Sequence, residues 1–262
     1  MRKSQSVLSR AQVELDPAAD GFGSVRFRAE VALGAVEEHL VREGDGLILL
    51  LAPPFDKASP DVGYIKAYPP GIRENGGQYS HAAVWVAQAF ARRGEGEKAV
   101  ELLRMLNPIE HAAKKEGTER YKIEPYVIAG DIYASADFIG RGGWSWYTGA
   151  AGWLYRVWIE EVLGFQRRDD ELTIDPVLPK DWDHIRLRYR YGKTLYRITI
   201  ENPQHCSRGV ALIEVDGAAA TEKMIRLQDD KVDHEVRVVL GNQPTSVTTL
   251  QSPGRAVHEL RV

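Results

Sequence analysis

The chain has 262 residues, of which 44% are hydrophobic, and a formal net charge of -3 with a pI near 6.2. This length supports one large hydrophobic core or two modest ones. The weakly acidic balance excludes the electrostatic footprint of a nucleic-acid-binding protein and a polybasic membrane patch. No apolar run reaches the roughly 18 residues of a membrane-spanning helix, and the N-terminal MRKSQSVLSR lacks the apolar part of a signal peptide.

We therefore expect a cytoplasmic protein, either by itself or as the soluble part of a membrane-associated one. The single cysteine, Cys206, excludes an internal disulfide framework and a zinc site built from several cysteines. We expect no metal and no organic cofactor.

Helical patterns dominate the first half of the chain after an irregular start. Residues 1–24 are polar, and DPAADGFG is typical of a turn or linker. Apolar residues at helical spacing predict a helix from Val25 to Arg42. Ser80 is a good N-cap for a second helix reaching Arg92, and Glu97–Leu106 completes an αα-hairpin. The side chains expected on the buried face of the second helix are Val84, Trp85, Ala87 and Phe90.

The segment Gly63–His81, GYIKAYPPGIRENGGQYSH, concentrates hydrogen-bonding side chains before the second helix. Pro69-Pro70-Gly71 excludes a helix there, and Gly76-Gly77 permits a positive φ or a close backbone approach. A polar loop carried on a helix is typical of a ligand-binding surface. A surface loop with a solvated charge cluster has the same composition, so the loop alone leaves both interpretations open.

A second polar loop, IGRGGWSWY, leads into a helix expected from near Thr148 to Gly164. Aromatic side chains are dense here. This density suits stacking on sugar rings, but it also suits the buried face of a helix. The residues concerned are Trp144, Trp146, Tyr147, Trp153, Tyr155 and Trp158.

After Gly164 the hydrophobic period changes from 3.6 to 2 residues. HIRLRYRY and TLYRITIEN flank Gly192-Lys193 and predict a β-hairpin. Strand-like runs follow at residues 209–215, 222–227, 233–240, 244–250 and 255–262. The predicted fold class is α+β: a partial (α/α)6 toroid in residues 25–168, with too few helices to close, then an antiparallel, β-sandwich-like domain in residues 169–262.

Several spaced motifs resemble, in the same order, the C-terminal region of the cyclic β-1,2-glucan synthases. More broadly they resemble the inverting disaccharide phosphorylases, which include the cellobiose and chitobiose phosphorylases. The motifs are GYIKAYPPGIRENGGQYSHAAVW, LNPIEHA, RYKIEPYVIAGDIY and GRGGWSWYTGAAGWLYR. The resemblance runs from about Glu37 to Asn202. It implies an (α/α)6 barrel with a C-terminal β domain, and phosphorolysis of a β-glucosidic bond, with β-1,2-glucan as substrate and inversion to α-glucose 1-phosphate.

In such a reaction a carboxylic acid protonates the leaving oxygen, and phosphate takes the place of the activated water of an inverting glycosidase. The resemblance implies phosphate contacts from the histidine of the ENG…H motif and from the Thr-Gly of the W-x-T-G-type motif. These are His81, Thr148 and Gly149. A hydroxyl, an unobstructed amide at a helix start and an imidazole donor all suit an anion. Inorganic phosphate is then a co-substrate, and a β-glucan oligosaccharide is the second partner.

The remaining polar residues of the motifs are candidates for binding sugar hydroxyls, with one tryptophan as a stacking platform. Arg73 and Glu74 could instead form a local ion pair with each other. Glu124, the residue before Pro125, could instead accept hydrogen bonds that fix its own loop. The candidates are Arg73, Glu74, Asn75, Gln78, Glu124 and Trp146.

The general acid of the family is an aspartate in a tryptophan- and glycine-rich segment upstream of the histidine motif, and this sequence has no such segment. Its own aspartates between the helices lie in unrelated contexts: Asp56, Asp61, Asp131 and Asp137. We therefore expect no catalytic acid in the chain, and no activity unless the upstream half of the same enzyme completes it. Two alternatives remain. One is a non-catalytic carbohydrate- or phosphate-binding protein that acts with a partner chain. The other is a glucoamylase-like toroid hydrolase, which requires a second carboxylate to activate water.

Overall fold

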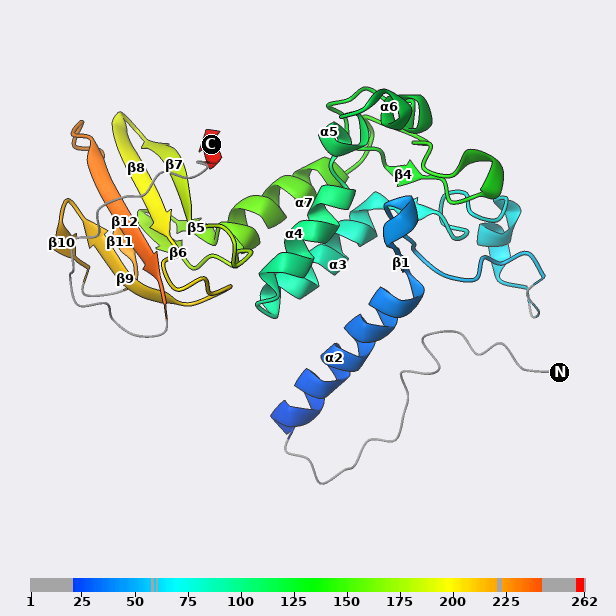
Figure 1. Ribbon diagram of the computed structural model, residues 1–262, viewed down its shortest axis with the longest axis horizontal. Helices are drawn as coiled ribbons and strands as arrows, with labels where there is room; N and C mark the ends of the chain where they lie inside the picture. The colour runs from blue at the N-terminus through cyan, green and yellow to red at the C-terminus, as the bar shows by residue number, and fades with distance from the viewer. Residues whose placement is uncertain (1–20, 58, 60, 221–222, 242–257, 262) are drawn as a thin grey trace. The chain divides into compact units, whose positions relative to one another are not determined.

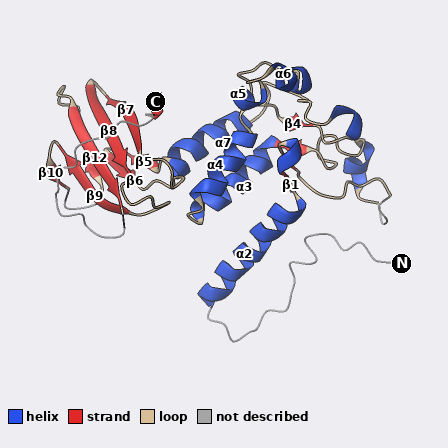
Figure 2. Cartoon of the chain, viewed as in Figure 1, coloured by secondary structure: helices blue, strands red, loops and turns tan. Residues whose placement is uncertain are grey.

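Two compact units make up the structure, a computed structural model that describes residues 21–57, 59, 61–220, 223–241 and 258–261 (Figure 1). The first unit comprises the described parts of Met1–Ala89 together with Leu102–Leu154, and the second comprises Phe90–Glu101 and the described parts of Tyr155–Val262. Helices and loops form most of the first unit and strands most of the second (Figure 2). No helix in the described ranges is long and apolar enough to cross a bilayer.

The predicted helices are present, and short ones occur between them. The α-helices are α2 (Gly21–His39), α3 (Ser80–Arg92), α4 (Gly96–Met105), α5 (Pro108–His111), α6 (Lys115–Tyr121) and α7 (Ala150–Arg156). The 3₁₀-helical segments are η1 (Glu43–Asp45), η2 (Gly63–Ala67) and η3 (Ala136–Phe138). The π-helical segment η4 (Val157–Val162) continues α7.

Helix α2 begins at Gly21, so the last four residues of the segment predicted to be irregular, 21–24, are helical. It ends at His39 rather than at the predicted Arg42, because Val41–Arg42 form a strand. The rest of that segment, residues 1–20, lies outside the described residues. Helix α3 has the predicted bounds, and α7 with η4 occupies the range expected to be one helix.

One side chain predicted to be buried on α3 is not. Val84, Ala87 and Phe90 are buried, whereas Trp85 is 49% exposed. Residues four apart share a helix face, so Trp85 lies on the face of His81. Its ring meets the His81 ring edge-on, with the centroids 4.8 Å apart.

Two small antiparallel sheets hold the loops of the first unit. β1 (Val41–Arg42) pairs with β2 (Leu47–Ile48), and β3 (Gln78–Tyr79) pairs with β4 (Asp131–Ile132). A core cluster lies beneath them, formed by Leu47, Leu49, Tyr121, Ala129 and Ile132. The β3–β4 pair therefore joins two sequence motifs that lie far apart in the chain.

The second unit contains a six-stranded sheet, in the order β10-β9-β12-β8-β7-β13, and a three-stranded sheet, in the order β11-β6-β5. The strands are β5 (Phe165–Arg168), β6 (Glu171–Ile174), β7 (His184–Tyr191), β8 (Thr194–Glu201), β9 (Val210–Val215), β10 (Ala218–Ala219), β11 (Ile225–Arg226), β12 (His234–Leu240) and β13 (His258–Arg261).

The β7–β8 hairpin is antiparallel, as predicted, and most other neighbours in these sheets are also antiparallel. However, β12 pairs with β8, and β13 with β7, in parallel. The large sheet is therefore mixed rather than purely antiparallel. The strand-like run at residues 244–250 lies outside the described residues. The predicted domain borders, near residues 24 and 168, stay a prediction.

Charged side chains tie the strands of the large sheet together. Arg237 on β12 donates to both carboxylate oxygens of Glu201, at 3.1 and 2.9 Å, and to Glu214 at 3.0 Å. His234 lies between Asp216 and Asp230, with nitrogen–oxygen distances of 2.7 and 3.1 Å. The hydrogen bond to Asp216, with the charge of both carboxylates, raises the pKa of His234.

Candidate functional site

Residues of three motifs line a pocket of about 140 Å³ in the first unit. The β3–β4 pairing brings the first two of these motifs together, since Tyr79 lies opposite Asp131 and the Ser80 amide donates to the Gly130 carbonyl at 3.0 Å. The pocket is lined by Arg73, Glu74, Tyr79, His81, Gly130, Asp131, Trp144, Tyr147, Thr148 and Gly149. The three residues predicted to bind phosphate therefore share one pocket with Arg73 and Glu74.

His81 and Gly149 lie against each other. A Cβ atom on Gly149 would be 3.3 Å from Cε1 and 3.4 Å from Nδ1 of His81, so a larger residue would press on the ring. The Nε2 atom of His81 is buried and has no hydrogen-bond partner among the described residues. The ring is held instead by Trp85 and by Trp153, whose centroid lies 5.9 Å away.

Thr148 stands where the loop enters α7. Its Oγ1 accepts a hydrogen bond from the Ala150 amide at 3.0 Å, which caps the first turn of the helix. A hydroxyl that accepts from the backbone still has its own proton to donate. The geometry therefore fixes Thr148 Oγ1 and leaves its O–H for a ligand in the pocket.

Two carboxylates face the same pocket. Asp131 is only 4% exposed; its Oδ1 accepts from the Trp144 amide at 3.0 Å, and its Oδ2 is without a partner in the described part of the chain. Burial raises the pKa of Asp131; the Trp144 amide and the charge of Arg73 oppose that rise, whereas Glu74 adds to it. Glu74 also has a buried oxygen, Oε2, for which the described residues provide no partner.

The sequence gives Asp131 no role, yet a signal was present. Asp131 follows Gly130, and its carboxylate lies where a Cβ on Gly143 would come within 2.5 Å. Gly143 in the IGRGGWSWY loop therefore makes room for the carboxylate of Asp131 on β4. Glycines in both motifs beside an isolated acidic residue indicate such a close approach.

Two other predicted sugar ligands, Asn75 and Gln78, are fully buried and do not line the pocket. The amide group of Asn75 donates to the carbonyls of Tyr68 and Phe55, at 2.7 and 3.1 Å, and accepts from the Phe55 amide at 2.6 Å. Gln78 accepts from the Ile48 amide at 2.8 Å. A sugar hydroxyl would have to displace the backbone partners of Asn75, so that side chain holds the loop in shape. Gln78 also bonds the backbone, but its buried Nε2 atom has no partner among the described residues.

Glu124 and Trp146 form a pair outside the pocket lining. The indole N–H of Trp146 donates to Glu124 Oε1 at 3.1 Å. The backbone amide of Glu124 itself and this indole lower the pKa of the Glu124 carboxyl. Trp146 is 63% exposed, and its ring meets that of Tyr126 at 6.4 Å. The pair presents an exposed aromatic surface beside an acidic group.

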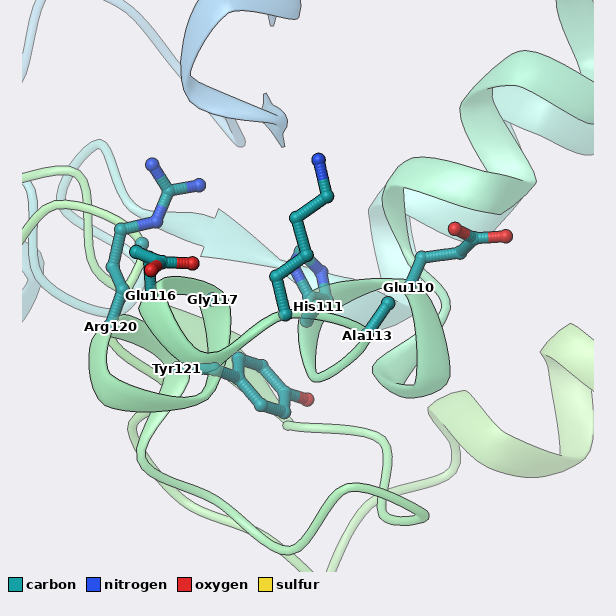
Figure 3. A pocket seen from close by; sticks show the side chains of 9 residues that line it. Glu110, His111, Ala113, Glu116, Gly117, Arg120 and Tyr121 are labelled. Carbon is teal, nitrogen blue, oxygen red and sulfur yellow. The ribbon is translucent and has the colours of Figure 1, made fainter.

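A larger hollow of about 500 Å³ lies elsewhere in the first unit (Figure 3). Its wall carries charges of both signs, from Glu110, Lys114, Glu116 and Arg120. His111 stacks on Tyr121 with their centroids 4.7 Å apart, and burial lowers its pKa. None of the predicted phosphate or sugar ligands lines this hollow, so the smaller pocket is the candidate site. Within the described residues, no three histidine, cysteine, aspartate or glutamate side chains are grouped to hold a metal.

Residues 14–164 match the catalytic domain of the glycosyl hydrolase 94 superfamily, and residues 165–207 match the C-terminal domain of glycosyl hydrolase family 65. The chain belongs to the glycosyl hydrolase 94 superfamily. This confirms the resemblance to the disaccharide phosphorylases and glucan synthases that the motifs indicate.

Among its relatives is the cyclic beta-(1,2)-glucan synthase NdvB of Rhizobium meliloti (strain 1021), 49% identical over 169 residues, which are 64% of this chain and 6% of the relative. Another is the N,N'-diacetylchitobiose phosphorylase of Vibrio proteolyticus, 32% identical over 216 residues, 82% of this chain and 26% of that enzyme. The chain thus spans a small part of either relative. A GH92 α-mannosidase, BT3965 of Bacteroides thetaiotaomicron, aligns over 86% of this chain and 23% of its own, with a TM-score of 0.31 and 14% identity. That likeness is too slight to bear on the fold.

Proposed function

We propose that this chain forms the phosphate-binding side of a site that cleaves β-glucosides by inverting phosphorolysis. The donor is β-1,2-glucan, the product is α-glucose 1-phosphate, and the helices are part of an (α/α)6 toroid. The observation that carries the proposal is the presence of His81, Thr148 and Gly149 in one pocket. The similarity to a β-1,2-glucan synthase supports the linkage, and the similarity to a phosphorylase supports the use of phosphate.

In the proposed reaction a phosphate oxygen attacks the anomeric carbon while the bond from that carbon to the leaving sugar oxygen breaks. The leaving oxygen takes a proton from a carboxylic acid, and the configuration inverts. His81, Thr148 and Gly149 hold the phosphate by donors fixed in advance, which lowers the barrier by positioning and by charge stabilisation. The acid comes from outside these residues, from the upstream half of the enzyme. Phosphate is the co-substrate, and the chemistry requires no cofactor.

On the sugar side, Glu74 accepts from a hydroxyl in the pocket, and Trp146 with Glu124 forms a rim on which a further sugar unit stacks. Asn75 and Gln78 act through the loop whose backbone they hold. This division follows from the contacts above, because only Glu74 among the loop's uncharged and acidic candidates lines the pocket.

A second function, hydrolysis, has one observation in its favour. Glu74 and Asp131 place two carboxylates in the pocket, and burial raises the pKa of Asp131. An inverting hydrolase uses one carboxylic acid and one carboxylate, the latter to activate water. Phosphorolysis is preferred because hydrolysis leaves His81, Thr148 and Gly149 without a role.

The test measures phosphate binding by calorimetry and the release of α-glucose 1-phosphate from β-1,2-glucooligosaccharides. Thr148→Val is compared with wild type and with Thr173→Val, which removes a strand hydroxyl bonded to the Gln166 carbonyl in the second unit. We expect Thr148→Val to weaken phosphate binding about 10- to 100-fold, the value of one hydrogen bond to a charged group. Thr173→Val should bind as wild type does.

We expect no product from the chain alone, and product once the separately expressed upstream half is added to wild type but not to Thr148→Val. Product from the chain alone would show that it contains its own acid. Glucose released without phosphate would favour hydrolysis. Sugar and phosphate binding without activity in the mixture would favour a non-catalytic binding protein.

A further inference from the structure

Arg73 has a backbone conformation that non-glycine residues rarely adopt, with φ at 50°. The loop fixes it there: the Gly77 amide donates to the Arg73 carbonyl at 3.1 Å, and a Cβ on Gly77 would lie 2.8 Å from that carbonyl oxygen. Buried Asn75 anchors the same turn, because its carbonyl accepts from the Gly71 amide at 2.8 Å. Left-handed backbone at a bulky residue is kept where the surroundings over-determine it, and it is frequent at ligand sites.

The guanidinium of Arg73 lies over aromatic rings. Its central carbon is 4.2 Å from the ring centroid of Trp144 and 5.3 Å from that of Tyr68. Such stacking uses the face of the guanidinium and leaves the N–H groups in its plane free to donate. No side-chain hydrogen bond or ion pair joins Arg73 to any described residue. Arg237 in the large sheet, by contrast, donates to two carboxylates.

The charges in the pocket require a cation beside a phosphate. Glu74 and Asp131 line it, so a phosphate that Thr148, Gly149 and His81 hold would also face two acidic side chains. An arginine meets phosphate with two parallel N–H groups, which adds both strength and orientation. Arg73 lowers the pKa of Asp131 by its charge, but it forms no ion pair with Asp131 or Glu74, so neither carboxylate occupies its donors.

From this arrangement we infer that Arg73 is a phosphate-binding residue, held on the Trp144 ring so that its N–H edge meets the anion in the pocket. The inference rests on the proposed function, and it replaces the sugar-binding role that the motif predicts for Arg73. Trp144 is then a positioning residue, since it acts on the phosphate through Arg73.

The experiment titrates the whole chain with inorganic phosphate, and separately with a β-1,2-glucooligosaccharide, using wild type, Arg73→Gln, Arg73→Lys and Arg141→Gln. Arg141 is the matched control, because its guanidinium also lies over a ring, that of Phe138 at 5.5 Å, but outside the pocket lining. We expect Arg73→Gln to weaken phosphate binding about 10- to 100-fold and Arg73→Lys to weaken it less. Arg141→Gln should match wild type, and oligosaccharide binding should be equal in all four proteins.

A folded Arg73→Gln protein that binds phosphate like wild type, while Thr148→Val does not, would overturn the inference and leave the proposed function standing. Equal phosphate binding by wild type and Thr148→Val would instead contradict the proposed function. Loss of oligosaccharide rather than phosphate binding in Arg73→Gln would return Arg73 to the sugar side. If Arg73→Gln fails to fold, Arg73→Lys decides the question. A phosphate affinity equal to that of wild type would overturn the contact through two parallel N–H groups. Trp144→Leu, which keeps the backbone amide that binds Asp131, should weaken phosphate binding to a lesser degree than Arg73→Gln.

Discussion

His81 in the pocket and His234 in the large sheet are both partly buried histidines, yet their ring nitrogens have opposite surroundings. His234 has a carboxylate oxygen at each nitrogen, whereas His81 Nε2 has no partner in the described structure and lies among aromatic rings. Arg237 and Arg73 differ in the same way. A polar group paired within the protein stabilises the fold, while a buried group left unpaired costs stability and remains available to a ligand. The comparison thus separates side chains that hold the structure from those that we propose to bind phosphate and sugar.

The largest effect on stability is expected from replacing Asn75. This residue lies next to the pocket, but its side-chain amide is fully hydrogen-bonded to the backbone. Asn75→Leu would leave the Phe55 and Tyr68 backbone groups unpaired, and we expect it to lower the free energy of unfolding by about 2–4 kcal/mol. Urea unfolding measures this. Asn107→Ala, which removes the cap bonded to the Ile109 amide, should cost only about 1 kcal/mol. A smaller cost for Asn75→Leu than for Asn107→Ala would contradict the distinction between side chains that hold the loop and side chains that line the pocket.

A gain in stability is expected when the charge of Asp131 is removed. Its pKa is raised on folding from an ordinary value of 3.8, so the folded state holds the proton more tightly and loses stability as pH rises through the folded pKa. Asp131→Asn keeps an oxygen for the Trp144 amide and removes the buried charge. We expect it to be more stable than wild type at pH 7 by about 1 kcal/mol, with the difference disappearing as the solution is acidified toward pH 4. Thermal melting across this range measures it, and a variant less stable than wild type at neutral pH would contradict the interpretation that the Asp131 carboxylate is buried with Oδ2 unpaired.

The smallest effect on stability is expected from replacing His234. Its pKa is raised above the ordinary 6.5, chiefly by Asp216, so the stability it contributes is complete below that value and is lost as pH rises through the folded pKa. His234→Gln should cost about 0.5 kcal/mol at pH 6 and less above pH 8, because its partners are partly exposed. Melting curves at the two pH values give the comparison. An equal cost at both would mean that packing on Tyr196, rather than charge, is what His234 contributes.

Much of the fold could be predicted from local signals. Ser80 and the apolar spacing behind it give the bounds of α3, and strict alternation with Gly192-Lys193 gives the β7–β8 hairpin. Helices α5 and α6 are too short and too polar for a periodic pattern. The parallel pairing of β12 with β8 joins strands that are not neighbours in the chain, and no local pattern encodes it.

The site could be predicted in part, through motifs rather than through geometry. His81, Thr148 and Gly149 lie together, as their shared role requires. Asn75 and Gln78 could not be distinguished from Glu74 in advance, because a polar loop residue satisfies either a ligand or the backbone, and only the folded loop decides. Asp131 was missed because the glycines Gly130 and Gly143 indicate only a close approach. The burial of its carboxylate and the hydrogen bond from the Trp144 amide exist only in the folded protein.

The two-residue strands β3 and β4 have a consequence for how the pocket comes into being. They are short, but they pair residues from distant parts of the chain, and the pocket walls on either side depend on that pairing. Closing so long a loop costs entropy before any contact within it is gained, so such pairings form late and limit the folding rate. A chain can therefore complete α3 and the β7–β8 hairpin, both built from local contacts, before it has anywhere to hold an anion.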